Sequence, residues 1–425
     1  MEYLHVIPAS TGRTVDFLRC MEERFDLSEH RFLTLISRAG LIKGCPGLLE
    51  FPFVETLESR GGPFRRLRNA LALRRRLRKA DVIVWHGLRS NGGKFAFALM
   101  LDPALCRRSV WIEDGVDEES WTQYGSRLKR WIFNCAQRFV RRRIPVLGES
   151  FPGNGSYALS CWPDKRVFDT PYPPGAELAA LAAERRASGA VPGVEPYLRW
   201  KAERDEAAAE AEAAGEEGAI DAAAEKEQAL PIEPLRPRER PLVQIGMNAQ
   251  ALNRHNRAFR ALAPFAEEPF YFVIPTGFCL PSRRVEAGAA AYKATLRRQS
   301  RRLGEKRLFP GRKVSPPAYG AYLRRLNAAV FAGSHAVASD YLLLLLCAGV
   351  KLYLPEDSFL YAELRARGVR VHRLEELKGA GAEELVAPDP DEPLPPELAK
   401  YLDEDYIADC WRRLFEALRK GGDGK

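Results

Sequence analysis

The chain has 425 residues, of which 46% are hydrophobic and 28% charged, and its formal net charge is +9. This composition can bury cores in two or three domains and excludes global disorder, collagen and coiled coil. The longest apolar run, residues 341–350, is about half as long as a membrane-spanning helix must be. The N-terminus reads as a buried strand and lacks the features of a secretion signal, so we expect a soluble, unexported protein.

Up to about residue 176, short apolar runs alternate with segments of helical spacing. We expect strands at 3–8, 31–37, 48–53, 81–86, 109–113 and 144–148. We expect helices at 14–24, 65–79, 93–101 and 127–142. Strands that alternate with helices indicate a parallel sheet covered on both faces.

Residues 177–240 differ in composition from the rest of the chain. The stretch 201–228 is almost wholly Ala, Glu and Lys, and it contains ten acidic and three basic residues. It therefore contributes −7 to the net charge, and the remainder of the chain carries +16. With no apolar stripe to bury, such a stretch is a marginal helix or a disordered linker, and a Pro-rich spacer follows it. We expect a linker or insertion without chemistry.

The alternation returns after the linker. We expect strands at 242–247, 270–275, 307–309, 329–332, 351–355 and 369–374. We expect helices at 253–265, 283–303, 317–327, 334–348 and 360–368. The predicted fold class is therefore α/β, with two Rossmann-like parallel-sheet domains, residues 1–176 and 241–425, that face a central cleft for a ligand.

Three turns in the second half are candidate ligand loops. A strand runs into Gly246 and a helix follows, so a ligand could approach the backbone and an anion could meet free N–H groups. The GxGxxG fingerprint is absent, which gives no support for a nicotinamide cofactor. Ser334 and His335 precede another helix and could bind a diphosphate, although Ser334 could equally be an N-cap. The turn Pro275-Thr276-Gly277 is a ligand loop or a plain turn.

In the first half, polar residues follow two of the expected strands. Glu113, Asp114 and Asp117 end one strand, where a general base would point into the cleft. His86 ends another strand, although a lone histidine is more often structural. Asp114-Gly115 is also ordinary turn chemistry. The expected catalytic residues are Asp117, Asp114 and His86.

Two stretches of the first half are strongly basic. Residues 64–79 carry eight Arg and Lys, and residues 127–143 carry seven, interleaved with aromatic residues. Basic amphipathic helices suit an anionic membrane surface. Nucleic acid would be attracted by the same charges, and the arginines could also be merely exposed beside a packed apolar stripe. The candidate membrane or acceptor residues are Arg65, Arg66, Arg74, Arg75, Arg130, Trp131, Arg141 and Arg142.

Metal ligands are scarce in the sequence. The eight cysteines include no Cys-x-x-Cys pair, which disfavours a zinc site and fits reduced thiols. Asp389-Pro390-Asp391 matches the DxD by which some glycosyltransferases bind a metal, but it lies in a Pro-rich loop without a strand. We expect no metal and no other cofactor.

The sequence resembles the bacterial TDP-4-acetamido-4,6-dideoxygalactose:lipid II transferases of enterobacterial common antigen synthesis. HVIPASTGRTVDFL with the later SEHRF is similar to the start of that family. WHGL resembles the family's aromatic-His-Gly strand end, and DGVD resembles its WGAD. IGMNAQALNRH resembles VGNSGDRSNEH and carries Gly246, Asn253 and His255, while FVIPTGF resembles VVPMGY. These pieces occur in the same order on both sides of the linker.

The resemblance implies a metal-independent GT-B glycosyltransferase. In such enzymes the C-terminal half binds the nucleotide sugar and the N-terminal half binds a lipid-linked glycan acceptor, on the cytoplasmic face of the bacterial inner membrane. The donor site would then include Gly246, Asn248, Asn253, His255, Pro275, Thr276, Gly277, Ser334, His335 and Glu356. Several of these positions differ from the family's residues, so the base (TDP or UDP) and the sugar are left open.

The resulting hypothesis is sugar transfer from a nucleotide donor to a lipid-linked acceptor at an anionic membrane, with no nucleic acid partner. One alternative is a basic protein that binds lipid or RNA without turnover. Another is a nucleotide-sugar epimerase with the same fold.

Overall fold

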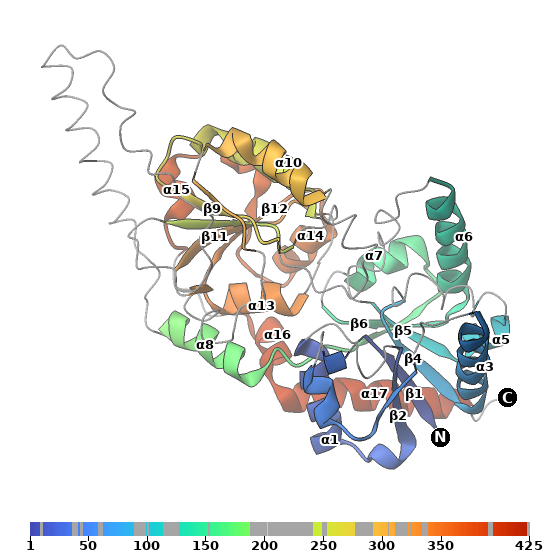
Figure 1. The fold of residues 1–425 in the computed structure, drawn as a ribbon. Coiled ribbons are helices and arrows are strands. Elements are labelled where there is room, and N and C mark those ends of the chain that lie inside the picture. The colour runs from blue at the N-terminus through green and yellow to red at the C-terminus, as the bar shows by residue number, and fades with distance from the viewer. Residues whose placement is uncertain are drawn as a thin grey trace, which may run out of the picture.

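The structure is a computed structural model. It describes residues 1–8, 12–35, 41–42, 46–57, 63–88, 99, 102–113, 127–151, 154–187, 202, 241–248, 253–276, 292–304, 306–310, 322–323, 325–333, 339–389 and 394–422. These residues form two parallel sheets with helices on their faces (Figure 1).

The first sheet has seven parallel strands in the order β3-β2-β1-β4-β5-β6-β7. Its strands are β1 (Tyr3–Ile7), β2 (His30–Thr34), β3 (Val54–Thr56), β4 (Val82–His86), β5 (Ser109–Glu113), β6 (Val146–Glu149) and β7 (Arg166–Asp169). Every residue of β1, β4 and β5 is buried. This is the pattern of strands covered on both faces.

One face of the first sheet packs against three helices, of which α3 and α6 are strongly basic. These are α3 (Pro63–Lys79), α5 (Pro103–Arg107) and α6 (Arg127–Arg143), which lie on one side of the sheet in Figure 1. Leu77 of α3 and Val140 of α6 join the core there. The helices α1 (Gly12–Arg24) and α7 (Asn154–Cys161) and the 3-10 turns η1 (Leu27–Glu29) and η2 (Pro46–Glu50) complete this half of the chain.

The second sheet has six parallel strands in the order β10-β9-β8-β11-β12-β13. They are β8 (Leu242–Ile245), β9 (Tyr271–Val273), β10 (Arg307–Leu308), β11 (Leu326–Val330), β12 (Lys351–Leu354) and β13 (His372–Arg373). Its helices are α10 (His255–Leu262), α13 (Ser339–Cys347), α14 (Phe359–Ala366), α15 (Ala382–Val386) and α16 (Pro396–Ala399). The 3-10 turns are η6 (Ala263–Phe265), η7 (Ser300–Leu303), η8 (Leu374–Lys378) and η9 (Lys400–Leu402).

The two sheets share one topology. Within each sheet the strand order reverses after the first strand, between β1 and β4 and between β8 and β11. In doubly wound sheets, ligands bind outside the carboxyl ends of the strands at this switch point. The segments that follow β1, β4, β8 and β11 are therefore the expected ligand-binding segments.

Two helices tie the halves together. The helix α8 (Ala176–Ala187) contacts α13, and its Ala182 is buried in the core of the second sheet. The last helix, α17 (Glu404–Gly422), packs on the first sheet, where its Trp411 donates to the carbonyl oxygen of Pro171 at 2.9 Å. Figure 1 shows α17 beside β1 and β2. The last helix of the expected domain 241–425 thus packs on the first sheet, and the helix α8 lies at the start of the expected linker 177–240.

Some expected elements differ from the structure. The apolar residues 48–53 form no strand: residues 46–50 are the 3-10 turn η2, and the strand β3 begins at Val54. Pro46 begins this turn and Pro52 follows it, and neither can donate to a sheet ladder. The strand β11 begins at Leu326, inside the expected helix 317–327. The elements α7, β7 and α17 were not expected.

Candidate functional site

The switch point of the second sheet is built around Gly246, directly after β8. Gly246 has a φ of +64°, and a Cβ atom there would lie 2.7 Å from Nε2 of His255. Its N–H donates to the carbonyl oxygen of Val330 at the end of β11. A side chain is thus excluded both by the backbone conformation and by the contact. The glycine therefore allows His255 and Asn253 to pack directly against the backbone at the end of β8.

The side chain of Gln244 binds the backbone at the start of the loop that follows Gly246. The Gln244 amide donates to the carbonyl oxygen of Gly246 at 2.9 Å. The hydroxyls of Tyr322 and Tyr341 both donate to Gln244 Oε1 at 2.6 Å. A buried glutamine with this many partners fixes the position of the Gly246 carbonyl.

Asn253 and Asn248 close the loop before α10. The backbone N–H of Met247 donates to Asn253 Oδ1 at 3.3 Å, and Asn253 Nδ2 donates to the carbonyl and side-chain oxygens of Asn248, both at 3.0 Å. The structure therefore brings together Gly246, Asn248, Asn253 and His255, which the sequence placed in one donor site.

His255 is fully buried at the start of α10. Its Nδ1 pairs with the hydroxyl of Tyr292 at 3.1 Å. Its Nε2, beside Gly246, has no hydrogen-bond partner among the described residues. Burial lowers the pKa of His255 to about 3, so the ring is neutral at physiological pH.

The other expected donor residues follow β9, the strand next to β8, or β12, or lie outside the described residues. Thr276 is buried, and its hydroxyl donates to the carbonyl oxygen of Pro310 at 3.1 Å, so it ties two strand ends together. Pro275 precedes it. The exposed carboxylate of Glu356, after β12, accepts from Arg373 at 3.4 Å. Gly277, Ser334 and His335 lie outside the described residues.

The switch point of the first sheet contains His86, at the end of β4. His86 is 3% exposed, and its Nδ1 lies 2.5 Å from the hydroxyl of Tyr172. Its Nε2 lies 3.0 Å from His5 Nδ1, and His5 Nε2 lies 3.0 Å from His30 Nδ1. His86, His5 and His30, which we call the histidine row, thus form a continuous hydrogen-bonded line. The other expected catalytic residues, Asp114 and Asp117, lie outside the described residues.

The imidazoles of the row are uncharged. Burial, followed by the positive charge of Arg13, lowers the pKa of His86 to about 3. Burial likewise lowers the pKa of His30 to about 4 and that of His5 well below its usual range. A neutral imidazole has one N–H and one acceptor nitrogen. Both hydrogen bonds between the three histidines can therefore form if every ring donates in the same direction along the row.

Three carboxylates lie side by side at the carboxyl edge of the first sheet. Glu113 of β5 pairs in register with Glu149 of β6, which pairs with Asp169 of β7. Burial raises the pKa of Glu149 to about 7, and its Oε1 accepts the N–H of Gly155 at 2.8 Å. The sequence analysis did not include Glu149. The signal was present, because Glu149 directly follows the expected strand 144–148, at the same edge of the sheet as Glu113.

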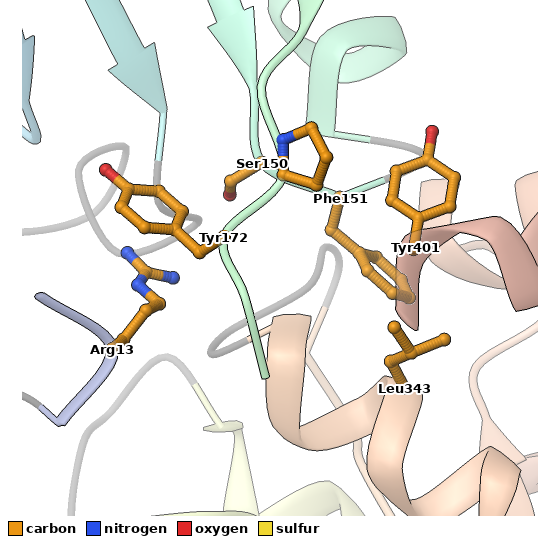
Figure 2. A pocket seen from close by; sticks show the side chains of 7 residues that line it. Arg13, Ser150, Phe151, Tyr172, Leu343 and Tyr401 are labelled. Atoms are coloured by element: carbon orange, nitrogen blue, oxygen red, sulfur yellow. The ribbon is translucent and has the colours of Figure 1, made fainter. Parts of the chain in front are cut away.

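A small pocket lies where the two halves meet. The first half lines it with Arg13, Ser150, Phe151, Pro171 and Tyr172, and the second half with Leu343 and Tyr401. Figure 2 shows Arg13 beneath the ring of Tyr172, with Leu343 and Tyr401 on the opposite side. The guanidinium carbon of Arg13 is 4.2 Å from the Tyr172 ring centroid, a cation–π contact.

The basic helices expose apolar side chains near their N-terminal ends and bury them near their C-terminal ends. Phe64 is 90% exposed on α3, and Leu128 and Trp131 are 65% and 64% exposed on α6. Arg74, Arg75 and Arg142 are also exposed. For Arg65, Arg66 and Arg130 only the helical backbone is described.

Arg141 differs from the other candidate membrane residues because it is buried. Its guanidinium carbon is 5.0 Å from the ring centroid of Trp111 on β5. The ammonium of Lys165 donates to the carbonyl oxygens of Arg141 and Ile144 at the end of the helix. Arg141 therefore packs α6 on the sheet instead of facing outward.

The described residues contain no group of three or more histidine, cysteine, aspartate or glutamate side chains placed to hold a metal ion. Asp389 of the DxD match instead pairs with His372 Nε2 at 2.9 Å. No helix in the described part of the chain combines the length and apolar character needed to cross a membrane.

No protein-family model matches the chain, and no curated protein matches its sequence. Solved structures match its fold over nearly the whole length. HepE from Anabaena, in complex with UDP and glucose, is 12% identical with a TM-score of 0.57, covering 98% of this chain and 100% of HepE. The α,α-trehalose-phosphate synthase (UDP-forming) from Burkholderia vietnamiensis is 13% identical with a TM-score of 0.52, covering 99% of this chain and 100% of the synthase. These similarities confirm the predicted GT-B arrangement of two Rossmann-like domains.

Proposed function

We propose that this chain is a glycosyltransferase that moves a sugar from a nucleotide-sugar donor to a lipid-linked glycan acceptor. The observation that carries the proposal is the pair of doubly wound sheets with separate switch points, in a fold similar to proteins solved with UDP and UDP-glucose. The specific family is the one that the sequence resembles, the lipid II transferases of enterobacterial common antigen synthesis.

The donor would bind to the second half. Gly246 and the loop held by Gln244 and Asn253 lie at the switch point, where nucleotides bind in such sheets. Ser334 and His335, which follow β11 in sequence, lie outside the described residues and are the proposed diphosphate contacts. In this proposal a helix N-terminus there stabilises negative charge on the departing diphosphate.

The acceptor would bind to the first half, beside the membrane. The exposed side chains Phe64, Leu128 and Trp131 share the basic helices α3 and α6 with many arginines. Apolar side chains beside cations favour adsorption to an anionic bilayer surface. In the proposed mechanism a carboxylate, Asp114 or Asp117, takes the proton of the acceptor hydroxyl.

Thermal melting of the purified protein against UDP, TDP, GDP, CMP and ADP tests the donor half of this proposal. A ligand that binds only the native state at about 100 times its Kd adds roughly 2.7 kcal/mol to the free energy of unfolding. We expect one base to raise the melting temperature while the others do not. If none of the five nucleotides raises the melting temperature, with or without anionic vesicles, nucleotide-sugar transfer is contradicted. That result would favour a basic protein that binds lipid or RNA without turnover.

Product analysis separates transfer from epimerisation. Incubation with the selected nucleotide sugar alone should leave the sugar unchanged, since transfer requires an acceptor. An altered sugar released without acceptor would identify an epimerase and overturn the proposal.

A further inference from the structure

We propose that Gln244 is a positioning residue that couples two segments of the donor site, the loop that follows Gly246 and the start of α13. It acts through hydrogen bonds to both segments and does not itself touch the substrate. The inference rests on the proposed function, because the donor is the molecule that the two segments would hold. The coupling between the segments can be measured without any ligand.

Gln244 is a polar residue in an apolar, central strand. The other residues of β8 are Leu242, Val243 and Ile245, and the strand lies between β9 and β11. The Gln244 side chain is completely buried on the same face of the sheet as Leu242, whose core includes residues of α13. A buried amide is costly unless its polar atoms have partners, so packing alone would be served better by an apolar side chain.

Three hydrogen bonds fix the orientation of the Gln244 amide. Its Nε2 donates to the carbonyl oxygen of Gly246 at 2.9 Å, and its Oε1 accepts from the hydroxyls of Tyr322 and Tyr341, each at 2.6 Å. A backbone carbonyl can only accept, so the nitrogen must face Gly246. Exchange of the two ends of the amide would set Oε1 against the Gly246 carbonyl. The buried network therefore has one arrangement.

Tyr341 connects Gln244 to the part of the chain that carries the expected diphosphate contacts. It lies in the first turn of α13, which begins at Ser339. Ser334 and His335 lie outside the described residues, but His335 is only four positions before Ser339, so the start of α13 fixes one end of their segment. Through Gln244, the position of that end depends on the loop that follows β8.

Tyr322 provides an internal comparison for Tyr341. Both hydroxyls donate to the same atom at the same distance, but Tyr322 precedes β11 and Tyr341 follows it. The carboxyl end of β11 is at the switch point, so Tyr341 comes from the side on which the donor would bind. Loss of either hydroxyl removes one bond from Gln244, but only the loss from Tyr341 releases α13 from it.

Two matched substitutions test the coupling. Tyr341→Phe and Tyr322→Phe each remove one hydroxyl and keep the ring, so both should lower stability. The probe is UDP, replaced by whichever nucleotide the melting panel selects, and its Kd is measured by calorimetry. We expect Tyr341→Phe to raise this Kd several-fold and Tyr322→Phe to change it much less. Without ligand, hydrogen exchange of residues 339–347 should be faster in Tyr341→Phe than in Tyr322→Phe.

Gln244→Glu tests the bond to Gly246 through its dependence on pH. An ionised carboxylate can accept from both tyrosines but cannot donate to the Gly246 carbonyl, whereas a protonated carboxyl can do both. Burial raises the pKa of a carboxyl, so the variant's affinity for UDP, relative to that of the wild type, should rise as the pH falls from 8 to 5.5. Wild-type affinity at pH 8, or a loss that is the same at every pH, would overturn the role of this bond.

The outcomes separate this inference from the proposed function. Equal exchange rates in Tyr341→Phe and Tyr322→Phe would overturn the coupling and leave the proposed function intact. Different exchange rates with equal Kd values would overturn the part that Gln244 plays in donor binding. If no nucleotide binds the wild type, the proposed function is refuted and Gln244 has no donor to position, but the exchange rates still decide whether it couples the two segments.

Discussion

Gly246 and His255 are packed so closely that a Cβ atom on residue 246 would lie 2.7 Å from the His255 ring. The contact joins the end of β8 to the start of α10, on the two sides of the proposed donor loop. Gly246 also has a φ of +64°, which L-residues rarely adopt.

Gly246→Ala should therefore lower the free energy of unfolding by about 2–5 kcal/mol, since it adds both backbone strain and a clash. Gly349 provides the control, because its φ is +67° but nothing lies within 4 Å of its Cβ position. Gly349→Ala should cost about 1–2 kcal/mol from strain alone. Urea unfolding measures both costs, and equal costs would contradict the close contact. Nucleotide binding should weaken only in Gly246→Ala.

The histidine row makes the fold sensitive to acid. In the folded state the pKa is about 3 for His86 and about 4 for His30, whereas an unfolded histidine has a pKa of about 6.5. At a pH between its folded and unfolded pKa values, each histidine gains a proton on unfolding. The unfolded state then binds more protons, so stability falls as the pH falls, by about 1.4 kcal/mol per pH unit for each histidine. Urea unfolding from pH 7.5 to 4.5 should show this slope.

His5→Phe should make that slope shallower, because it removes one buried histidine and breaks the row. Phe17→Leu serves as the control, since Phe17 contacts both His5 and His86 but does not titrate. Phe17→Leu should lower the free energy of unfolding by the same amount at every pH, without changing its slope against pH. An unchanged slope in His5→Phe would show that His5 does not gain a proton on unfolding in this range.

The exposed apolar residues of α6 should govern adsorption to membranes. Replacement of Leu128 and Trp131 by serine removes apolar area worth about 1.5–3 kcal/mol per side chain if it is buried in the bilayer surface. Partition onto phosphatidylglycerol vesicles should then fall tenfold or more in sedimentation assays. Ile42 is 60% exposed and belongs to neither α3 nor α6, so Ile42→Ser should partition as the wild type does. Equal partition of all variants would contradict the membrane assignment.

Much of the architecture could be predicted because buried parallel strands are continuous apolar runs. Residues 109–113 were expected as a strand and form β5 with the same bounds. The turn η2 was mistaken for a strand because residues 48–53 are mostly apolar, although the nearby prolines disfavour a strand. The helix α17 was missed although Ile407, Trp411 and Leu414 recur at helical spacing. Its sequence pattern predicts an apolar face but does not indicate that this face packs on the first sheet.

The candidate site was only partly predictable from the sequence. Gly246, Asn253 and His255 are near one another in the chain, so a local motif was enough to group them. The histidine row joins residues up to 81 positions apart, and Tyr172 lies another 86 beyond His86. Such a network depends on strand order and register, which the sequence pattern alone does not supply.

The proposed base can be tested directly. Asp114→Asn and Asp117→Asn keep the side-chain size but remove the carboxylate that would accept a proton. One of them should lower transfer by about 10²–10⁴-fold in an assay with radiolabelled donor and lipid-linked acceptor. Nucleotide binding should persist in both, because we propose that the donor binds to the other half. Full transfer by both folded variants would contradict the assignment of the base.

Glu149 gives a prediction with the opposite dependence on pH. Its folded pKa of about 7 lies above the usual value near 4.5, so the folded state binds more protons between these values. The stability that the protonated carboxyl contributes is complete below about pH 4.5 and is lost as the pH rises through 7. Glu149→Gln keeps an oxygen to accept the N–H of Gly155 and cannot ionise. It should match the wild type at pH 4.5 and be more stable by about 1–3 kcal/mol at pH 8.

The exposed Glu416 provides the control, since Glu416→Gln should leave stability unchanged at both pH values. Urea unfolding at pH 4.5 and 8 measures each difference. A lower stability of Glu149→Gln at pH 8 would mean that the ionised carboxylate is stabilised by its surroundings. Retention of a destabilising carboxylate at the end of a strand is characteristic of functional sites, where stability is exchanged for activity. If Glu149→Gln gains stability and loses transfer activity, Glu149 joins Asp114 and Asp117 as a candidate base.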